Sequence, residues 1–334
     1  MKSSALWLIL AGILIPFAIT NAQTLNVEQA RKEGEVVLYS TITVAAFNEL
    51  NKAVKEKYPF LNVRQIRLGP AQQLAKIMQE HRAGQPTADV VYNNLLHLIY
   101  LKENNVLGRY ESPENKFLMP EAIDADGFWV GGDIDVLVTG FNTKLISRND
   151  VPTTYDGFLN AKLKGQMAIN ANNPYALVGI ASLRGEEQGI AYMRKLVQQN
   201  LRPVQGFTHM VNLLAAGEYL IALMSQVTKI EEMKEKGAPV DWAPNTPNFS
   251  TVGVYALSTK SPHPAGARLL IDFALSEQGQ RVLGRTGKLP MRRGVATGSK
   301  SIDKLLESGN LHPVKDAKDF EKYAKIYREL LERR

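Results

Sequence analysis

Short runs of hydroxyl and amide side chains recur along this sequence, each directly after a segment that is predicted to be a strand. The four predicted strands cover residues 35–40, 88–93, 166–170 and 219–224. Ser, Thr and Asn can hold a polar or anionic small molecule through hydrogen bonds without a fixed charge. The residues from which we expect ligand contact are Ser40, Thr41, Thr43, Asn93, Asn94, Asn170, Asn172, Asn173, Tyr175, Thr208, His209, Ser225, Gln226 and Thr228.

These polar runs are expected to lie at one edge of a sheet. In an open α/β sheet, ligands bind outside the carboxyl ends of the strands. Helix N-termini there offer unpaired backbone N–H groups and the positive end of the helix dipole. Each run taken alone is equally compatible with plain helix capping, because Ser, Thr and Asn are preferred N-caps. Two runs in each half of the chain favour a shared cleft.

The segments that must position these runs alternate between strand and helix patterns. A helical repeat of Phe47, Leu50 and Val54 follows the first strand, and a second helix is predicted to begin at Gly69-Pro70. Strand and helix in alternation indicate βαβ units and a parallel sheet. Two longer strands are predicted at 133–142 and 249–258, and Gly131-Gly132 is a candidate hinge.

Composition and motifs argue against catalysis. The 334 residues include no cysteine, which excludes a thiol nucleophile, a Cys zinc site and a disulfide. There is no HExxH, GxSxG or GxGxxG motif, and GRTGK at 284–288 is interpreted as a surface turn. The net charge of +7 is spread along the chain, which does not favour nucleic-acid binding. We therefore predict a protein that is not an enzyme and has no cofactor.

The first 22 residues are typical of a secretory signal peptide. Lys2 precedes the apolar run Ala5 to Ile19, and Thr20-Asn21-Ala22 supplies small residues for cleavage. The run is shorter than the ~20 apolar residues of a transmembrane helix. An uncleaved N-terminal anchor is the alternative. We expect a mature chain that begins at Gln23 and resides in the periplasm.

The order of segments resembles the periplasmic solute-binding proteins of ATP-driven (ABC) importers, in the two-lobed cluster that includes the ferric-iron binders. The resemblance runs from about Glu33 to Val295. It is carried by EGEVVLYSTIT, LGPAQQLAKIMQEHRAGQPTADVVYNN, VLVTGFNTKLI, AAGEYLIALMSQ and STVGVYALSTKSPHPAGARLLIDFALSEQGQRVL. It implies an α/β fold of the periplasmic binding protein type II kind, with two lobes joined by two hinge strands around a cleft. Lobe 1 would comprise residues 23–132 plus 256–334, and lobe 2 residues 133–255.

The resemblance is weakest at the residues that bind the ligand in the family. Iron-binding members carry two adjacent tyrosines after the strand that corresponds to YLIALM, where this chain has Ser225-Gln226-Val227-Thr228. Ferric iron prefers anionic oxygen ligands, so a site of neutral amides and hydroxyls suits it poorly. Arg67 and Arg184 are candidate cations for an anion, although each is interpreted first as a surface charge. Tyr175 is the favoured aromatic contact.

The predicted function is therefore that of a monomeric exported binding protein. It would deliver a small anionic or phosphorylated organic solute to the membrane permease of an ABC importer. One alternative is ferric iron held through a bound anion such as citrate or carbonate. A second alternative is an exported enzyme or a sensor subunit on the same scaffold.

Overall fold

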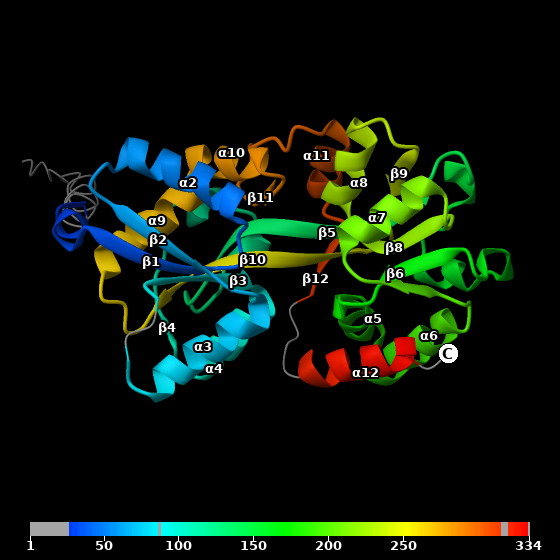
Figure 1. Ribbon diagram of the computed structural model, residues 1–334, viewed down its shortest axis with the longest axis horizontal. Coiled ribbons are helices and arrows are strands. Elements are labelled where there is room, and N and C mark those ends of the chain that lie inside the picture. Colours follow the sequence, from blue (N-terminus) through cyan, green and yellow to red (C-terminus); the bar gives the residue numbers. More distant parts are fainter. Residues whose placement is uncertain (1–26, 86–87, 315–319, 333–334) are drawn as a thin grey trace, which may run out of the picture.

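Two α/β lobes lie side by side and are joined by long strands, as the ribbon diagram of this computed structural model shows (Figure 1). The structure describes residues 27–85, 88–314 and 320–332. The predicted signal peptide at residues 1–22 lies outside them. The α/β class and the two-lobed architecture that the sequence predicted are confirmed.

The first lobe is built from parallel βαβ units. Strand β1 pairs in parallel with β2 on one side and with β3 on the other. The helices α2 and α3 carry their apolar residues toward this sheet, which follows from their 3.6-residue periodicity. The elements are β1 (Glu35–Ser40), α2 (Val44–Lys57), β2 (Asn62–Arg67), α3 (Pro70–Arg82), β3 (Val90–Asn94), α4 (Leu95–Glu103) and β4 (Leu107–Gly108).

The second lobe repeats this construction around β6, β7 and β8. Strand β6 pairs in parallel with both β7 and β8. The elements are β6 (Met167–Asn170), α5 (Tyr175–Arg184), α6 (Glu186–Val197), β7 (Arg202–Val204), α7 (Phe207–Ala216), β8 (Ile221–Gln226), α8 (Val227–Glu235) and β9 (Val240–Ala243).

The two lobes share one continuous sheet through the long strands β5 (Val130–Asn142) and β10 (Asn248–Ser258). The sheet order is β2-β1-β3-β10-β5-β8-β6-β7. Strands β5 and β10 pair antiparallel, with Asp133 opposite Gly253 and Asp135 opposite Thr251. These crossing strands correspond to the two predicted hinge strands.

Glycines in the crossing strands make room for two tyrosine rings. A Cβ atom at Gly132 would collide with the ring of Tyr255, and one at Gly253 would collide with the Tyr92 hydroxyl. The two rings lie 4.7 Å apart between centroids. The glycines at this point therefore permit close packing of the tyrosine rings, and the hinge at Gly131-Gly132 stays a prediction.

The chain crosses between the lobes a third time after β11. The last elements are α9 (Pro264–Leu275), α10 (Glu277–Arg285), β11 (Leu289–Pro290), α11 (Lys300–Glu307), β12 (Leu311–Pro313) and α12 (Phe320–Glu332). Helices α9 and α10 pack in the first lobe, whereas α11 lies beside α8 and α12 contacts α5 and α6 (Figure 1). Sequence analysis assigned all of 256–334 to lobe 1, so these contacts differ from the predicted boundary. The boundary differs because α11 and α12 pack against helices of the second lobe.

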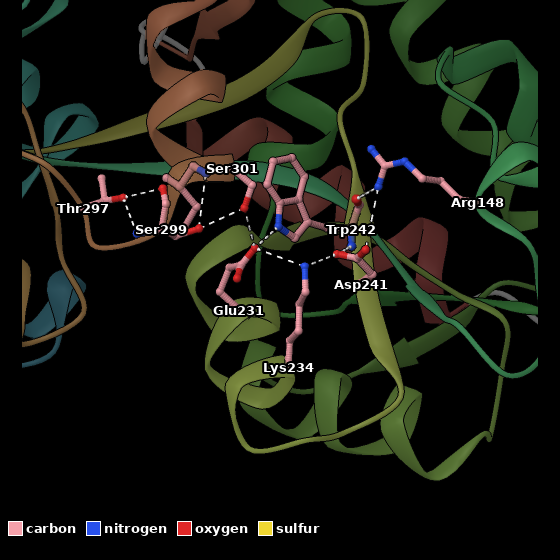
Figure 2. A network of polar contacts seen from close by, with 9 residues as sticks. Arg148, Glu231, Lys234, Asp241, Trp242, Thr297, Ser299 and Ser301 are labelled. Carbon is pink, nitrogen blue, oxygen red and sulfur yellow. Dashed lines mark hydrogen bonds and ion pairs between the residues drawn. The ribbon is translucent and has the colours of Figure 1, made fainter.

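A network of polar contacts attaches α11 to the second lobe (Figure 2). The Ser301 hydroxyl donates to the Glu231 carboxylate of α8 over 3.1 Å, and the indole N–H of Trp242 donates to the same oxygen over 2.5 Å. Lys234 pairs with Asp241 at 2.8 Å and lies 3.9 Å from Glu231. Glu231 is 9% exposed, so its carboxylate depends on these donors.

Replacing Ser301 with alanine is expected to lower the free energy of unfolding by about 1 kcal/mol, because a buried carboxylate then loses one hydrogen bond. Urea unfolding of Ser301→Ala measures the loss. In a Trp242→Phe background the same replacement should cost a different amount, because both residues donate to one oxygen. Equal costs in both backgrounds would contradict the network.

Candidate functional site

A cavity of about 270 Å³ lies between the two lobes, over the crossing strands. Both lobes and both crossing strands contribute to its wall. The lining residues are Thr41, Pro70, Tyr92, Asn93, Asn94, Asp133, Asp135, Leu137, Asn170, Asn172, Asn173, Tyr175, Phe207, Gln226, Thr251, Val252, Gly253 and Lys288. We call this cavity the cleft.

Asparagines at the end of β3 form the first lobe's side of the cleft. The Asn93 amide donates to the Gln73 side chain over 2.6 Å and to the Pro70 carbonyl over 3.2 Å. Asn94 caps helix α4, because its side-chain oxygen accepts from the His97 backbone N–H over 3.1 Å. The His97 ring nitrogen Nδ1 lies 2.6 Å from that same oxygen. Asn94 therefore both caps helix α4 and lines the cleft.

Asparagines after β6 form the second lobe's side. The Asn170 side-chain oxygen accepts from the Asn172 N–H at 3.0 Å and from the Gly206 N–H at 3.1 Å, which joins two loops. Asn173 accepts from the Tyr175 N–H at 3.2 Å. These bonds fix the loop 170–175 at the cleft edge through the side-chain oxygens of Asn170 and Asn173.

Four helices, two of which begin at glycine N-caps, start at the cleft. Pro70, Tyr175 and Phe207 are the first residues of α3, α5 and α7, and Gln226 is the N-cap residue of α8. All four line the cleft. Their N-cap residues form no side-chain capping hydrogen bond, although the Asn173 side chain accepts from the Tyr175 N–H at the start of α5. Because all four helix starts line the cleft, positive dipole ends from both lobes meet at one space. That arrangement favours an anionic group.

The floor of the cleft holds a cluster of charged groups that sequence analysis missed. Lys288 Nζ lies 2.8 Å from Asp133 Oδ2, and the Tyr92 hydroxyl donates to Asp133 Oδ1. Burial raises the pKa of Asp135, while the nearby Lys288 opposes that shift. Burial opposes the charged form of Lys288, but Asp133 and Asp135 outweigh it and hold the pKa of Lys288 above its usual value.

A signal for this cluster was present in the sequence. Asp133 and Asp135 stand two residues apart within an otherwise apolar strand, so both project from one face of the sheet. Two carboxylates on a buried strand face need partners. The partner, Lys288, belongs to the GRTGK segment that was interpreted as a surface turn, and this interpretation was wrong for Lys288.

The structure brings eight of the predicted ligand residues together at the cleft. They are Thr41, Asn93, Asn94, Asn170, Asn172, Asn173, Tyr175 and Gln226. Their assembly follows from the carboxyl ends of β1, β3, β6 and β8, which meet at the centre of the molecule. Ligand contact by these residues stays a prediction.

Three other predicted residues have local structural roles and do not line the cleft. The fully buried Ser40 hydroxyl oxygen accepts from the Ile42 N–H over 2.9 Å. Thr43 caps α2 by accepting from the Ala46 N–H over 3.3 Å. Ser225 is fully buried, because β8 continues to Gln226 and leads into α8 without the expected polar turn.

The remaining predicted residues lie on helix surfaces. Thr208 and His209 are exposed on α7. Thr228 is part of α8 and lines a different groove, between α8 and the segment after α10. Of the two candidate cations, Arg67 donates to the Ile42 carbonyl, and Arg184 pairs with Asp156 at 2.8 Å. Neither arginine lines the cleft.

The C-terminal helix supports the second lobe's cleft loop. The Tyr327 hydroxyl of α12 donates to the Asn170 carbonyl over 2.8 Å, and Tyr327 is 1% exposed. Asn170 in turn holds both Asn172 and Gly206. Tyr327 is therefore a positioning residue for the loop, acting from the last helix of the chain.

Replacing Tyr327 with phenylalanine is expected to lower the free energy of unfolding by about 1 kcal/mol, because the Asn170 carbonyl loses one of its two donors and keeps the Asn173 N–H at 3.2 Å. Tyr323→Phe on the same helix is the matched control. Its hydroxyl bonds to Glu186 at the surface, so we expect a change of about 0.5 kcal/mol or less. Chemical denaturation compares the two, and equal effects would count against the supporting role of Tyr327.

Comparisons with known proteins agree with this architecture. Residues 85–322 match the family model described as bacterial extracellular solute-binding protein. Iron-bound HitA from Pseudomonas aeruginosa superimposes with a TM-score of 0.77 at 21% identity, over 89% of this chain and 99% of that chain. The ferric binding protein from Campylobacter jejuni gives a TM-score of 0.76 at 20% identity, over 88% and 99%.

A sugar-phosphate complex is among the similar structures as well. AfuA from Actinobacillus pleuropneumoniae, with exogenous fructose-6-phosphate bound, gives a TM-score of 0.66 at 22% identity, over 90% of this chain and 97% of that chain. The fold is that of the two-lobed periplasmic binding proteins, as predicted. The chain belongs to the bacterial extracellular solute-binding protein family, whose members are not enzymes.

Among residues 27–85, 88–314 and 320–332, no helix has the length and apolar character that crossing a membrane requires. In the same part of the chain, no three His, Asp or Glu side chains gather in a group that could hold a metal ion.

Proposed function

We propose that this protein delivers a small anionic organic solute, in particular a phosphorylated one, to the permease of an ABC importer from the periplasm. The observation that carries the proposal is the convergence of four helix N-termini, from both lobes, on the cleft. Lys288 adds a cation on the floor of the same space. Backbone N–H groups, dipole ends and one lysine together suit a phosphate or a carboxylate.

The bound solute would act by linking the lobes. Amides on the first lobe and amides on the second lobe face one cavity, so a solute that touches both sides stabilises the closed form. The equilibrium shifts only by the difference in affinity between the closed and open forms. The closed monomer would then be the form that docks on the permease.

Native mass spectrometry of the protein as purified tests the class of solute. We expect a retained mass that contains phosphate or carboxylate and is released on denaturation. Small-angle X-ray scattering with that compound should then give a smaller radius of gyration than scattering without it. A bound neutral solute, or no compaction with any bound compound, would contradict the proposal.

Ferric iron held through a bound anion is the second candidate. It is favoured by the cleft carboxylates Asp133 and Asp135, and by the likeness to structures described as iron-bound and ferric binding proteins. Addition of ferric citrate would then produce a visible charge-transfer band that survives desalting. An unchanged spectrum together with no retained iron would remove this candidate.

A further inference from the structure

The two carboxylates on the cleft floor, Asp133 and Asp135, differ in their ion-pair and hydrogen-bond partners. Asp133 has a partner on each oxygen, namely Lys288 on one and Tyr92 on the other. Asp135 shares the cleft wall with Gln226, whose side chain lowers the pKa of Asp135 against the effect of burial. Within the described part of the chain, Asp135 forms no salt bridge of its own. A carboxylate has about four acceptor positions, and Asp135 lines the cleft, so a solute bound there can use this acceptor capacity.

An anionic group at the helix N-termini does not use this capacity, because an acceptor needs a donor. A solute that fills the cleft must therefore carry donor groups beside its anionic group, or leave Asp135 buried and poorly satisfied. Hydroxyl groups and an ammonium group are the two donor types that small organic solutes offer. The donor and acceptor groups around Asp135 distinguish between them.

Charges of both signs surround Asp135. Lys288 and Lys229 favour its ionised form, whereas the neighbouring Asp133 carboxylate opposes it. Charge alone therefore does not separate a hydroxyl from an ammonium group, and hydrogen-bonding capacity decides. The rest of the wall consists of amides and hydroxyls, such as Asn173 and Thr251, which both donate and accept. A hydroxyl can donate to Asp135 and accept from such a neighbour, whereas an ammonium group cannot accept.

We propose that Asp135 is a specificity residue that selects solutes carrying hydroxyl groups beside their anionic group, such as the phosphate of a polyol or sugar. This inference rests on the proposed function and extends it to the other end of the solute. Lys288 and the helix N-termini bind the anionic end. Asp135, which shares the cleft wall with Gln226, binds the hydroxylated end.

Three phosphates of one chain length test the inference by isothermal titration calorimetry. They are propyl phosphate, glycerol phosphate and aminopropyl phosphate. We expect the wild-type protein to bind glycerol phosphate at least about tenfold more tightly than propyl phosphate, as a hydrogen bond to a charged group provides. Aminopropyl phosphate should bind no better than propyl phosphate.

The variant Asp135→Asn keeps the shape of the side chain and removes the second acceptor oxygen. We expect it to reduce the preference for glycerol phosphate over propyl phosphate to about twofold or less. Asp150→Asn makes the same chemical change at an exposed position outside the cleft and should keep the full preference. Measurable binding of propyl phosphate by Asp135→Asn demonstrates that the cleft is intact.

The outcomes separate the two proposals. An unchanged preference in Asp135→Asn, no preference in the wild-type protein, or tighter binding of aminopropyl phosphate than of glycerol phosphate would overturn the role of Asp135 and leave the anion proposal standing. No binding of any of the three phosphates would overturn the phosphorylated solute class and this inference together.

Discussion

Replacing Lys288 with methionine is expected to lower the free energy of unfolding by about 3 kcal/mol at neutral pH. The Asp133 side chain is 4% exposed, and Lys288 supplies the only cation that pairs with it among the described residues. Without Lys288 the carboxylate stays buried with the Tyr92 hydroxyl as its remaining donor. Because an unpaired buried charge is costly, the loss should exceed that of a surface ion pair several-fold.

The double variant Asp133→Asn/Lys288→Met provides the control for this prediction. It removes both charges, so most of the lost stability should return. Urea unfolding of the two single variants and the double variant completes a double-mutant cycle. A Lys288→Met protein within about 0.5 kcal/mol of wild type would contradict the pairing described here.

Acid is expected to destabilise this protein through His97. Burial lowers the pKa of His97 from 6.5 to about 4. Between these values the unfolded chain binds a proton at His97 and the folded chain does not. Stability therefore decreases as the pH falls from about 6.5 to about 4, by on the order of 3 kcal/mol over the whole range. Above that range His97 is neutral in both states and contributes no pH dependence.

The variant His97→Gln isolates this contribution. Glutamine can still donate to Asn94 but does not titrate in this range. Other acidic groups affect both proteins equally, so the difference between the two unfolding free energies carries the signal. We expect that difference to change with pH below about 6.5 in favour of the variant. Parallel stability curves would show that His97 has no such role.

Much of the local structure was predictable from the sequence. The strand at 35–40, the helix that begins at Pro70 and the long strands near 133–142 and 249–258 all formed where their patterns indicated. Apolar periodicity depends on neighbours along the chain, and these segments carry it clearly. The polar runs after β1, β3 and β6 were also predictable.

The sequence predicted only some of the residues that line the cleft. Asn93 and Asn173 lie on its wall, whereas Ser225 belongs to the buried part of β8 and His209 to the surface of α7. A hydroxyl or amide side chain looks the same in the sequence whether it faces a cavity, a core or solvent. Strand length and helix rotation decide that direction, and a shift of one residue in a strand reverses it.

By itself the sequence determined the α/β alternation and the helix starts at Pro70 and after Gly206, because each depends on residues close together in the chain. The two lobes followed from the resemblance of the whole order of segments to a known family. Tertiary structure alone decided the pairing of Asp133 with Lys288, 155 positions later, and the packing of α12 on α5 and α6. Both need contacts between segments far apart in the chain. Such contacts form only when the crossing strands bring those segments together, and no local pattern records them.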